Sequence, residues 1–262
     1  LETIAPSELG ELVADSEIRE RILSACIVMA LIDSDLGPSE GAFLEELAAA
    51  LELESYALKD VQRMLNHSFL LARIDIARRS FLGQRGRAYM AEHGMTGAMR
   101  TVRALVGIEN PALAARYQAL EHNPRGTLGR EYFEFVRQNG FALPGEKGGA
   151  PEVVVFHDCL HVLGGYQTSS IEETQIASFQ AGMLDKDPIF GLLFMLAHFH
   201  IGVQITPITA AEKGVAVPEL MMAAFVRGTQ VNRDMCVDWI PQQDFDRKLT
   251  DLRATYNIQP RA

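Results

Sequence analysis

Apolar residues recur at three- and four-residue spacings along most of this chain, and this periodicity constrains the fold more than any other feature. The first thirty residues already show it, through Leu9, Leu12, Val13, Ile18, Ile22, Cys26 and Met29. Such spacing places apolar side chains on one face of an α-helix. We therefore expect an all-α chain, with a small helical domain over residues 1–80 and a multi-helix, bundle-like domain over residues 81–262.

Prolines and glycines indicate where the helices begin and end. Pro38 suits the first position of a helix, and Glu40 then lies in its first turn. Four glycines suit a boundary between the two domains; they are Gly83, Gly86, Gly94 and Gly97. In the second domain we expect helices over residues 98–107, 110–121, 126–139, 151–163, 170–184, 188–204, 217–236 and 243–255.

One segment of the second domain is ambiguous between strand and helix. Residues 153–156, Val-Val-Val-Phe, have the composition of a strand. However, Pro151 fits the first position of a helix, and the pair Gly164-Gly165 fits a helix end. We therefore expect a helix here.

Charge and cysteine content exclude several classes of protein. The 262 residues carry a net charge of −10, which argues against a general nucleic-acid binder because phosphate contacts need Lys and Arg. Cys26, Cys159 and Cys236 are distant from one another and form no C-x-x-C pair, as is typical of a reduced, cytoplasmic compartment. The first residues show no signal peptide.

The longest apolar region runs from Pro188 to Pro207. It is interrupted by His198, His200 and Gln204, whereas a membrane-spanning helix needs about 20 residues with few polar interruptions. We expect a buried core helix instead. His198 and His200 are two residues apart and point in different directions on such a helix, so at most one of them could reach a metal ion.

The sequence His157-Asp158-Cys159-Leu160-His161 contains the strongest chemical signal of the chain. Residues four apart on a helix are neighbours, so two imidazoles can bind one cation, as in H-E-x-x-H metalloenzymes. Asp158 can approach the same side, and Glu173 follows a Gly-Gly turn. Two nitrogen and two oxygen ligands suit Zn²⁺, Fe²⁺, Mn²⁺ or Co²⁺ better than Ca²⁺ or Mg²⁺.

Simpler explanations exist for each of these residues. A histidine pair four residues apart occurs by chance on many helices, and Asp158 could orient a histidine rather than bind a metal. Ser170 and Glu173 have the spacing of a capping box, in which Glu173 would bond to backbone at the helix start. Glu172 could cap from Ser169 in the same way. Composition and spacing leave these alternatives open.

The motif resembles the signature of the coenzyme Q biosynthesis protein 4 family, in which H-D-x-x-H precedes a glutamate by eleven residues. Further blocks of residues 83–262 also resemble that family. These are Thr127-Leu-Gly129, Tyr132, Phe135, Asn139-Gly-Phe141, His161-Val-Leu-Gly164 with Thr168, Ala224-Phe-Val-Arg227-Gly228, Asn232, Asp234, Trp239, Leu252-Arg253 and Tyr256-Asn-Ile258. The resemblance implies that His157, Asp158, His161 and Glu173 are the metal ligands and the catalytic residues.

The first eighty residues do not belong to that pattern. The segment Ala30 to Pro38, with Asp33, Asp35 and the following Glu40, resembles the helical TerB-like module of tellurite-resistance proteins. Asp33-x-Asp35 could also begin an EF-hand loop, but position twelve of such a loop would be Leu44 rather than Glu. We therefore expect a helix–loop–helix with an acidic face and no calcium site.

The resemblance of residues 83–262 implies a role in making ubiquinone or a related isoprenoid quinone. The implied step is oxidative decarboxylation of a prenylated hydroxybenzoate-type precursor, in which a hydroxyl group replaces the carboxylate. One divalent metal ion is implied, with zinc preferred and iron, manganese or cobalt as alternatives. A non-catalytic scaffold that binds the prenylated precursor and other quinone-biosynthesis proteins is the second hypothesis. A metal-dependent phosphohydrolase is disfavoured, because the additional His and Asp that it needs are missing.

An isoprenoid tail needs an apolar groove, and two regions could supply one. Residues 189–205 are one candidate wall, and Met221, Met222 and Phe225 are another, although both could be ordinary core. Arg227 could contact a polar head group or pair with an acid. We expect the substrate-binding residues to include Arg227, Met222 and Phe225. We also expect a bacterial-type protein with transient, peripheral membrane contact, and apolar helices that could form a homodimer.

Overall fold

The prediction of an all-α fold is confirmed by a computed structural model, which describes residues 4–32, 37–205 and 210–261. These residues form thirteen α-helices and short 3₁₀ segments, and they contain no β-strand. Two isolated bridges, Thr127 with Lys248 and Ile201 with Lys213, are the extended pairings found there. No helix in the described part of the chain is both long and apolar enough to cross a bilayer.

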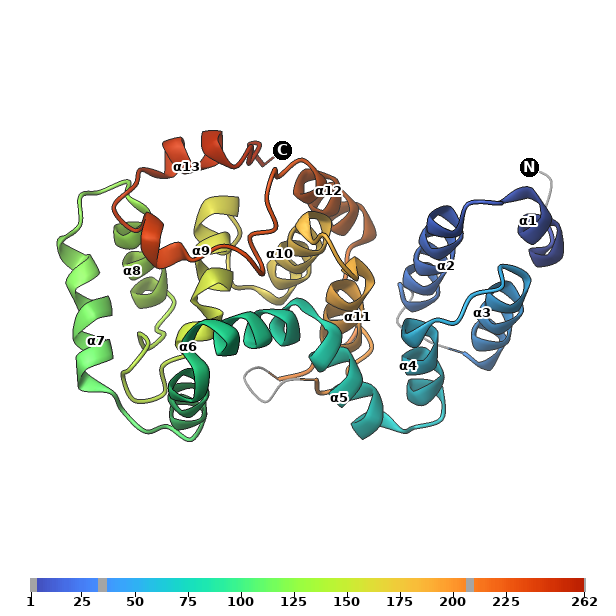
Figure 1. Ribbon diagram of the computed structural model, residues 1–262, viewed down its shortest axis with the longest axis horizontal. Helices are drawn as coiled ribbons and strands as arrows, with labels where there is room; N and C mark the ends of the chain where they lie inside the picture. Colours follow the sequence, from blue (N-terminus) through green and yellow to red (C-terminus); the bar gives the residue numbers. More distant parts are fainter. Residues whose placement is uncertain (1–3, 33–36, 206–209, 262) are drawn as a thin grey trace. The chain divides into compact units, whose positions relative to one another are not determined.

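The chain packs into two compact units (Figure 1). The first comprises residues 1–80 together with Ile189–Pro218, and the second comprises Phe81–Pro188 and Glu219–Ala262. One division between the two units falls after Ser80. The segment 189–218 packs with the N-terminal helices, although it lies within the predicted domain 81–262. That residues 1–80 and residues 81–262 each fold independently remains a prediction.

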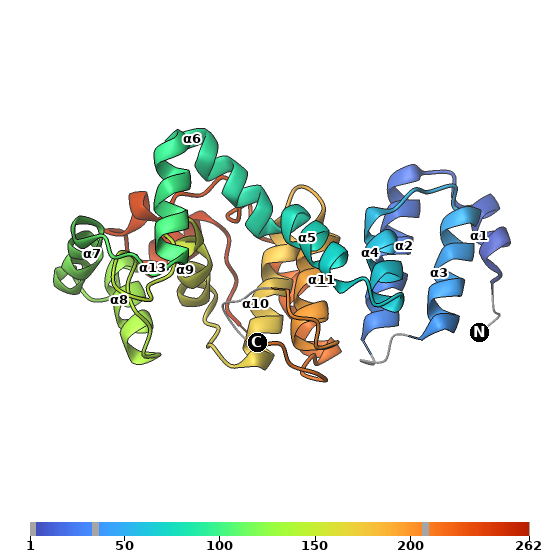
Figure 2. The same cartoon turned by 90° about the horizontal axis from the view of Figure 1, so that it is seen from below.

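In the first unit, helices α2, α3 and α4 lie side by side (Figure 2). Leu23, Ile27, Leu44 and Val61 are among the core residues that they bury. Helix α3 begins at Pro38, as the sequence predicts. The Glu40 carboxylate accepts the Gly37 amide at 2.6 Å. The helices are α1 (Pro6–Leu12), α2 (Ser16–Leu31), α3 (Pro38–Ala50), α4 (Tyr56–Leu65), α5 (Phe69–Arg79) and α11 (Pro188–Phe199). Asp33 and Asp35 of the TerB-like segment lie outside the described residues.

In the second unit, helix α9 contacts α8, α10 and α13 (Figure 1). Its apolar face, with Phe156, Leu160 and Leu163, joins Tyr132 and Trp239 in one core. The α-helices are α6 (Phe81–Leu105), α7 (Pro111–Gln118), α8 (Leu128–Gln138), α9 (Val155–Gly164), α10 (Ser170–Met183), α12 (Pro218–Thr229) and α13 (Leu249–Thr255). The 3₁₀ segments are Ala119–His122, Glu152–Val154 and Pro241–Asp244.

The four glycines that suit a domain boundary lie inside one helix. Gly83, Gly86, Gly94 and Gly97 all lie within α6, and Gly94 bends it with φ +57° and ψ −148°. Only glycine adopts that backbone conformation without strain. Gly94 therefore permits a kink within α6.

Two predicted helices end earlier than expected, because local hydrogen bonds replace the helical ones. Helix α12 ends at Thr229 rather than at residue 236. Beyond it, the Asp234 carboxylate accepts the amides of Cys236 and Val237 at 3.0 Å and forms a turn. Helix α11 ends at Phe199 rather than at residue 204, and Gly202 follows with φ +86°.

Helices α10 and α12 approach each other closely enough to require glycine. A Cβ atom on Gly228 would lie 2.1 Å from the Phe179 carbonyl oxygen, and one on Gly182 would lie 2.2 Å from that of Phe225. Real Cβ atoms are not found so close to backbone atoms, so the two glycines permit this crossing. The crossing fixes the position of α10, the helix that carries Glu173.

Candidate metal centre

Helix α9 presents His157 and His161 on one face, one turn apart. The helix begins at Val155, after the 3₁₀ segment Glu152–Val154, so the ambiguous Val-rich segment is helical. It ends at Gly164, and the next residue, Gly165, has a φ of +75°, the left-handed conformation common just after helix ends. The chain then returns to α10.

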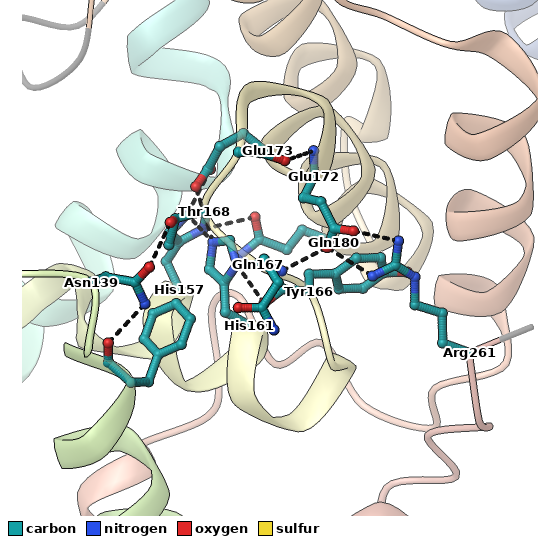
Figure 3. A network of polar contacts seen from close by, with 12 residues as sticks. Asn139, His157, His161, Tyr166, Gln167, Thr168, Glu172, Glu173, Gln180 and Arg261 are labelled. Atoms are coloured by element: carbon teal, nitrogen blue, oxygen red, sulfur yellow. Dashed lines mark hydrogen bonds and ion pairs between the residues drawn. The ribbon is translucent and has the colours of Figure 1, made fainter. Parts of the chain in front are cut away.

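Helix α10 begins in a way that separates the roles of its two glutamates. Ser169 is the N-cap residue, and its hydroxyl accepts the Glu172 amide at 3.4 Å. Glu172 accepts the Gln167 amide at 2.6 Å, so its carboxylate serves the backbone of the loop. The carboxylate of Glu173 instead faces the two histidines (Figure 3). Glu172, and not Glu173, is thus the glutamate that bonds to the backbone before α10.

Three of the four predicted ligands converge on one point (Figure 3). One ligand atom each of His157, His161 and Glu173 lies within 4.8 Å of the other two. The Nε2 atoms of the two imidazoles are 3.2 Å apart. Glu173 oxygens lie 3.5 Å from His157 Nε2 and 3.4 Å from His161 Nε2.

The second nitrogen of each imidazole determines which atom is free to bind a cation. His161 Nδ1 lies 3.3 Å from the Tyr166 carbonyl oxygen, and His157 Nδ1 lies 3.2 Å from the Gln180 amide oxygen. Both oxygens only accept hydrogen bonds, so each Nδ1 carries the proton. Both Nε2 lone pairs then point toward the Glu173 carboxylate. Such an arrangement is repulsive unless a proton or a metal ion lies between the three groups.

Aromatic rings hold the two imidazoles from the side. The Phe135 ring stacks on His161 at 5.4 Å between centroids, and the Phe81 ring stacks on His157 at 6.3 Å. The side chain of His161 is 1% exposed, whereas that of His157 is 23% exposed and that of Glu173 is 19% exposed. The site is therefore rigid on the His161 side and reachable from solvent on the other.

The electrostatics favour a positive charge within the group formed by His157, His161 and Glu173, called the triad below. Burial opposes protonation of His157, but the Glu173 carboxylate outweighs it and raises the pKa of the imidazole. Burial acts against ionisation of Glu173 as well, yet the two imidazoles, when protonated, outweigh it and hold the pKa of its carboxyl well below the usual range. An anionic Glu173 beside two neutral imidazoles is a suitable donor set for zinc or iron.

Asp158 lies at the edge of this group and not within it. Its carboxylate is outside the 4.8 Å cluster found among the described residues. It lies in the first turn of α9, where a negative charge is favourable. Burial raises the pKa of Asp158, and the two histidines oppose that effect. The geometry places Asp158 as a neighbour of the ligands, and its role as a fourth ligand stays a prediction.

Residues that are distant in sequence support the loop between α9 and α10. Asn139 accepts a hydrogen bond from the Thr168 hydroxyl at 2.8 Å. Arg253 donates to the carbonyl oxygens of Leu163 at 2.9 Å and Val162 at 3.1 Å, at the end of α9. Several of the separate sequence blocks singled out above therefore meet around the metal-site loop.

The C-terminal residues reach the same loop. Arg261 forms two hydrogen bonds of 2.7 Å with the Glu172 carboxylate, one from each terminal nitrogen (Figure 3). It also donates to the Gly165 carbonyl oxygen at 3.1 Å, and its guanidinium lies 4.8 Å from the centroid of the Tyr166 ring. Arg261 thus fixes the segment that supplies both the Tyr166 carbonyl and Glu173.

The predicted substrate-binding residues lie on α12. Arg227 is buried, donates to the Gln259 carbonyl oxygen at 2.7 Å and packs against the rings of Tyr166 and Phe179. Met222 is exposed and Phe225 is half-buried. The contacts of Arg227 connect α12 to the C-terminal segment, and the substrate-binding role of the three residues stays a prediction.

His198 and His200 belong to the first unit and have structural partners there. His198 Nδ1 accepts the Ile205 amide at 3.1 Å. His200 Nδ1 accepts the Ala216 amide at 3.0 Å, and its Nε2 donates to the Ile32 carbonyl oxygen at 2.7 Å. Both rings thus have hydrogen-bond partners within the first unit.

Gln180 is the site residue that sequence reasoning missed. It lies seven residues after Glu173, on the same face of α10, so helical spacing could have identified it. The Tyr166 carbonyl carries no sequence signal, because any residue supplies a backbone oxygen. The stacking of Phe135 and Phe81 depends on packing between helices and is equally hidden in the sequence.

Comparison with solved structures yields a distant likeness. No protein-family model matches the chain, and no curated protein matches it. The chain is similar to a solved structure from Nostoc punctiforme that is assigned provisionally to ubiquinone biosynthesis, with 16% identity and a TM-score of 0.38. The likeness covers 74% of this chain and 98% of the other. It is too distant to assign this chain to a family.

Proposed function

We propose that this chain binds one divalent metal ion, preferably zinc, through His157, His161 and Glu173, and that it acts in the biosynthesis of ubiquinone or a related isoprenoid quinone. The observation that carries the metal assignment is the convergence of both Nε2 lone pairs and the Glu173 carboxylate. The substrate class is supported by the sequence resemblance, since the matching blocks around Asn139 and Arg253 surround the same site.

The reaction that fits this proposal is oxidative decarboxylation of a prenylated hydroxybenzoate-type acid. The bond between ring and carboxyl carbon breaks, carbon dioxide leaves, and a bond forms between the ring and an oxygen atom of dioxygen. The second oxygen atom leaves as water, with two electrons and two protons from an external donor. A bound divalent ion would supply Lewis acidity to the carboxylate and phenolate oxygens of the substrate.

The residues of the chain would orient the ligands and shield the site. Gln180 and the Tyr166 carbonyl hold the two imidazoles by their Nδ1 atoms, and Phe135 covers His161. A divalent ion held by only three protein ligands would have a coordination position for substrate, as in catalytic rather than structural zinc sites. A substrate would enter from the side on which His157 is partly exposed.

The metal assignment is tested by elemental analysis of the purified chain. We expect about one divalent ion per chain for wild type, and loss of that ion in His157→Ala and Glu173→Gln. His122→Ala is the matched control, because His122 is exposed and distant from the triad in sequence. Unchanged metal content in the triad variants, with the control also unchanged, would contradict the assignment.

The reaction is tested with a prenylated 4-hydroxybenzoate labelled at its carboxyl carbon. Wild-type protein with dioxygen and a reductant should release labelled carbon dioxide, and Glu173→Gln should not. Tight binding of the labelled acid without release would instead support the scaffold hypothesis. A metal-loaded protein that neither binds nor converts the acid would contradict the assignment to quinone biosynthesis.

A further inference from the structure

Helices α2 and α3 lie side by side in the first unit (Figure 2), and a groove of about 390 Å³ opens beside them. A hollow of this size can accept several side chains of a bound molecule. Most of its walls are apolar, and the residues that line it are Cys26, Met29, Ala30, Ser39, Glu40 and Phe43. Met29 is 70% exposed and Phe43 is 48% exposed, so two large apolar side chains are left to water.

Helix α2 carries a second apolar stripe that continues the groove along its length. The first stripe is buried in the core of the unit and comprises Leu23, Ile27 and Leu31. The second follows at positions i, i+4, i+8 and i+11, on one side of the helix, and comprises Ile18, Ile22, Cys26 and Met29. Ile18 is 48% exposed and Ile22 is half-buried. An apolar strip of this length beside a groove is typical of a surface that binds a partner.

The negative charge of the chain is concentrated in the segment that forms this groove. Residues 1–54 contain thirteen Asp or Glu and two Arg, a net charge of −11, while the remaining residues together carry +1. Both arginines are already paired, Arg19 with Glu52 at 3.3 Å and Arg21 with Glu17. The field around the groove therefore attracts a positively charged partner and repels a negatively charged one.

Carboxylates also lie at the groove itself. Glu40 lines it, and its carboxylate is engaged by the Gly37 amide at 2.6 Å. Glu46 follows Phe43 by three residues, on the same side of α3, and is exposed. It forms no ion pair with a residue that the structure describes, and no Lys or Arg is among the described residues that line the groove. Glu46 is therefore available to pair with a cation of the bound molecule.

We propose that the groove binds a cationic amphipathic helix of a partner protein. Its apolar face would contact Met29 and Phe43, and its Lys or Arg side chains would pair with Glu46. An amphipathic helix in an apolar groove is a common mode of recognition. Charge disfavours other occupants, because a second copy of this chain, a nucleic acid or an anionic lipid surface would each bring negative charge to the same segment. The inference rests on α2 and α3 and is independent of the metal site.

The reactivity of Cys26 reports whether the groove is occupied in the full-length protein. Cys26 is half-buried, whereas Cys159 and Cys236 are 0% exposed, so a maleimide should modify Cys26 first. The probe is a peptide of about 18 Leu and Lys residues, five helical turns, with Leu confined to one face. At about ten times its Kd it should slow the modification about tenfold, since a covered thiol reacts only in the free protein. A matching peptide of Leu and Glu should not protect Cys26.

Variants of exposed residues separate the apolar contact from the charge. Met29→Ser with Phe43→Ser should weaken peptide binding about tenfold, and Glu46→Lys should weaken it about fivefold. The apolar control is Leu12→Ser with Leu70→Ser, because these residues are 72% and 66% exposed but do not line the groove. The charge control is Glu109→Lys, an exposed residue of the second unit, which changes the net charge equally. Controls that weaken binding as much as the groove variants would overturn the proposal.

The same assay distinguishes the cationic helix from other occupants. Protection of Cys26 by the Leu/Lys peptide should disappear in about 1 M salt, where charges are screened within a few ångströms. Equal protection by the Leu/Glu peptide, or stronger protection by a non-ionic detergent, would show an apolar site without charge preference. Protection that increases with the concentration of the protein alone would show that a second copy covers the groove. Each of these results would overturn the proposal and leave the metal assignment untouched.

Discussion

Gln180 determines which nitrogen of His157 can bind a cation. Its amide oxygen lies 3.2 Å from Nδ1, and its own amide nitrogen is buried without a hydrogen-bond partner among the described residues. An unsatisfied buried donor costs about 1–3 kcal/mol. The unpaired Gln180 amide nitrogen thus destabilises the fold slightly. The same orientation of Gln180 directs the His157 Nε2 lone pair toward Glu173 and His161, as cation binding would require.

We predict that Gln180→Leu weakens metal binding while the fold is retained. Without the acceptor, the His157 ring is free to change tautomer and rotate, and loss of such a partner typically costs about 10–100-fold in affinity. Competition with a chromophoric chelator measures this. Gln180→Glu retains an oxygen acceptor and should stay near wild type. Equal affinities for wild type and Gln180→Leu would show that Gln180 does not orient the ligand.

Asp60 is a buried carboxyl group whose ionisation opposes folding. It is 0% exposed, and one oxygen lacks a partner while the other accepts from Arg63 at 2.6 Å. Burial is the main cause that raises its pKa to about 6, and the nearby Asp75 adds to it, whereas Arg63 and Arg79 oppose the shift. The folded protein therefore holds a proton that the unfolded chain releases at a lower pH.

The sign of the resulting pH dependence follows from the raised pKa. Stability from Asp60 is present in full below its unfolded value of 3.8 and is lost as pH rises through about 6. Relative to Asp60→Asn, wild type should gain about 1.4 kcal/mol between about pH 7.5 and pH 5. Urea denaturation of both proteins at the two pH values measures the difference. Parallel pH profiles would contradict a raised pKa at this residue.

At the scale of helices, the crossing of α10 and α12 positions one metal ligand. A Cβ at residue 228 would overlap the Phe179 carbonyl oxygen, and backbone cannot move aside as a side chain can. We predict that Gly228→Ala lowers the free energy of unfolding by about 2 kcal/mol, within the range for overpacking. Thermal or urea denaturation measures this loss.

The control for Gly228→Ala is Gly86→Ala in α6. No atom lies within 4 Å of a Cβ added at Gly86, and its backbone is helical. Alanine there should stabilise the helix by about 0.5–1 kcal/mol, because glycine loses more conformational entropy on folding. If both substitutions had the same sign, the close approach of α10 and α12 would not explain the effect at Gly228.

Helical periodicity predicts the helices themselves better than their ends or their neighbours. The all-α fold and the starts at Pro38 and Ser170 follow from local signals. The end of α12 at Thr229 depends on the Asp234 side chain, which competes with helical hydrogen bonds. The packing of segment 189–218 with the N-terminal helices has no local signal, because periodicity shows that a face is buried and not what covers it.

Within the candidate site, spacing identifies the ligands, and tertiary contacts determine their orientation. The i, i+4 pair on α9 is visible in the sequence, while the choice between Glu172 and Glu173 is not. Both glutamates have a serine three residues earlier, so capping logic fits either of them. The fold separates them because Arg261, from the far end of the chain, binds Glu172.

On the scale of the whole second unit, the C-terminal segment closes the structure around the metal centre. Arg261 links α10 to the loop after α9 through Glu172 and the Gly165 carbonyl. The hydrogen bonds from Arg261 are the main cause that lowers the pKa of the Glu172 carboxyl. A bidentate arginine–carboxylate contact fixes geometry better than a single bond. Residue 261 therefore contributes to a site formed a hundred residues earlier in the sequence.

We predict that Arg261→Gln weakens metal binding about tenfold, in the range for loss of a supporting partner. Without the contacts of Arg261 to Glu172 and Gly165, the 165–172 loop should exchange its amide hydrogens faster. The Tyr166 carbonyl should then hold His161 less firmly. Chelator competition and hydrogen exchange measure the two effects. Arg247→Gln is the matched control, since Arg247 pairs with Asp244 at 3.0 Å and does not contact this loop. If Arg261→Gln and Arg247→Gln changed metal affinity equally, the C-terminal segment would have no specific role at the metal centre.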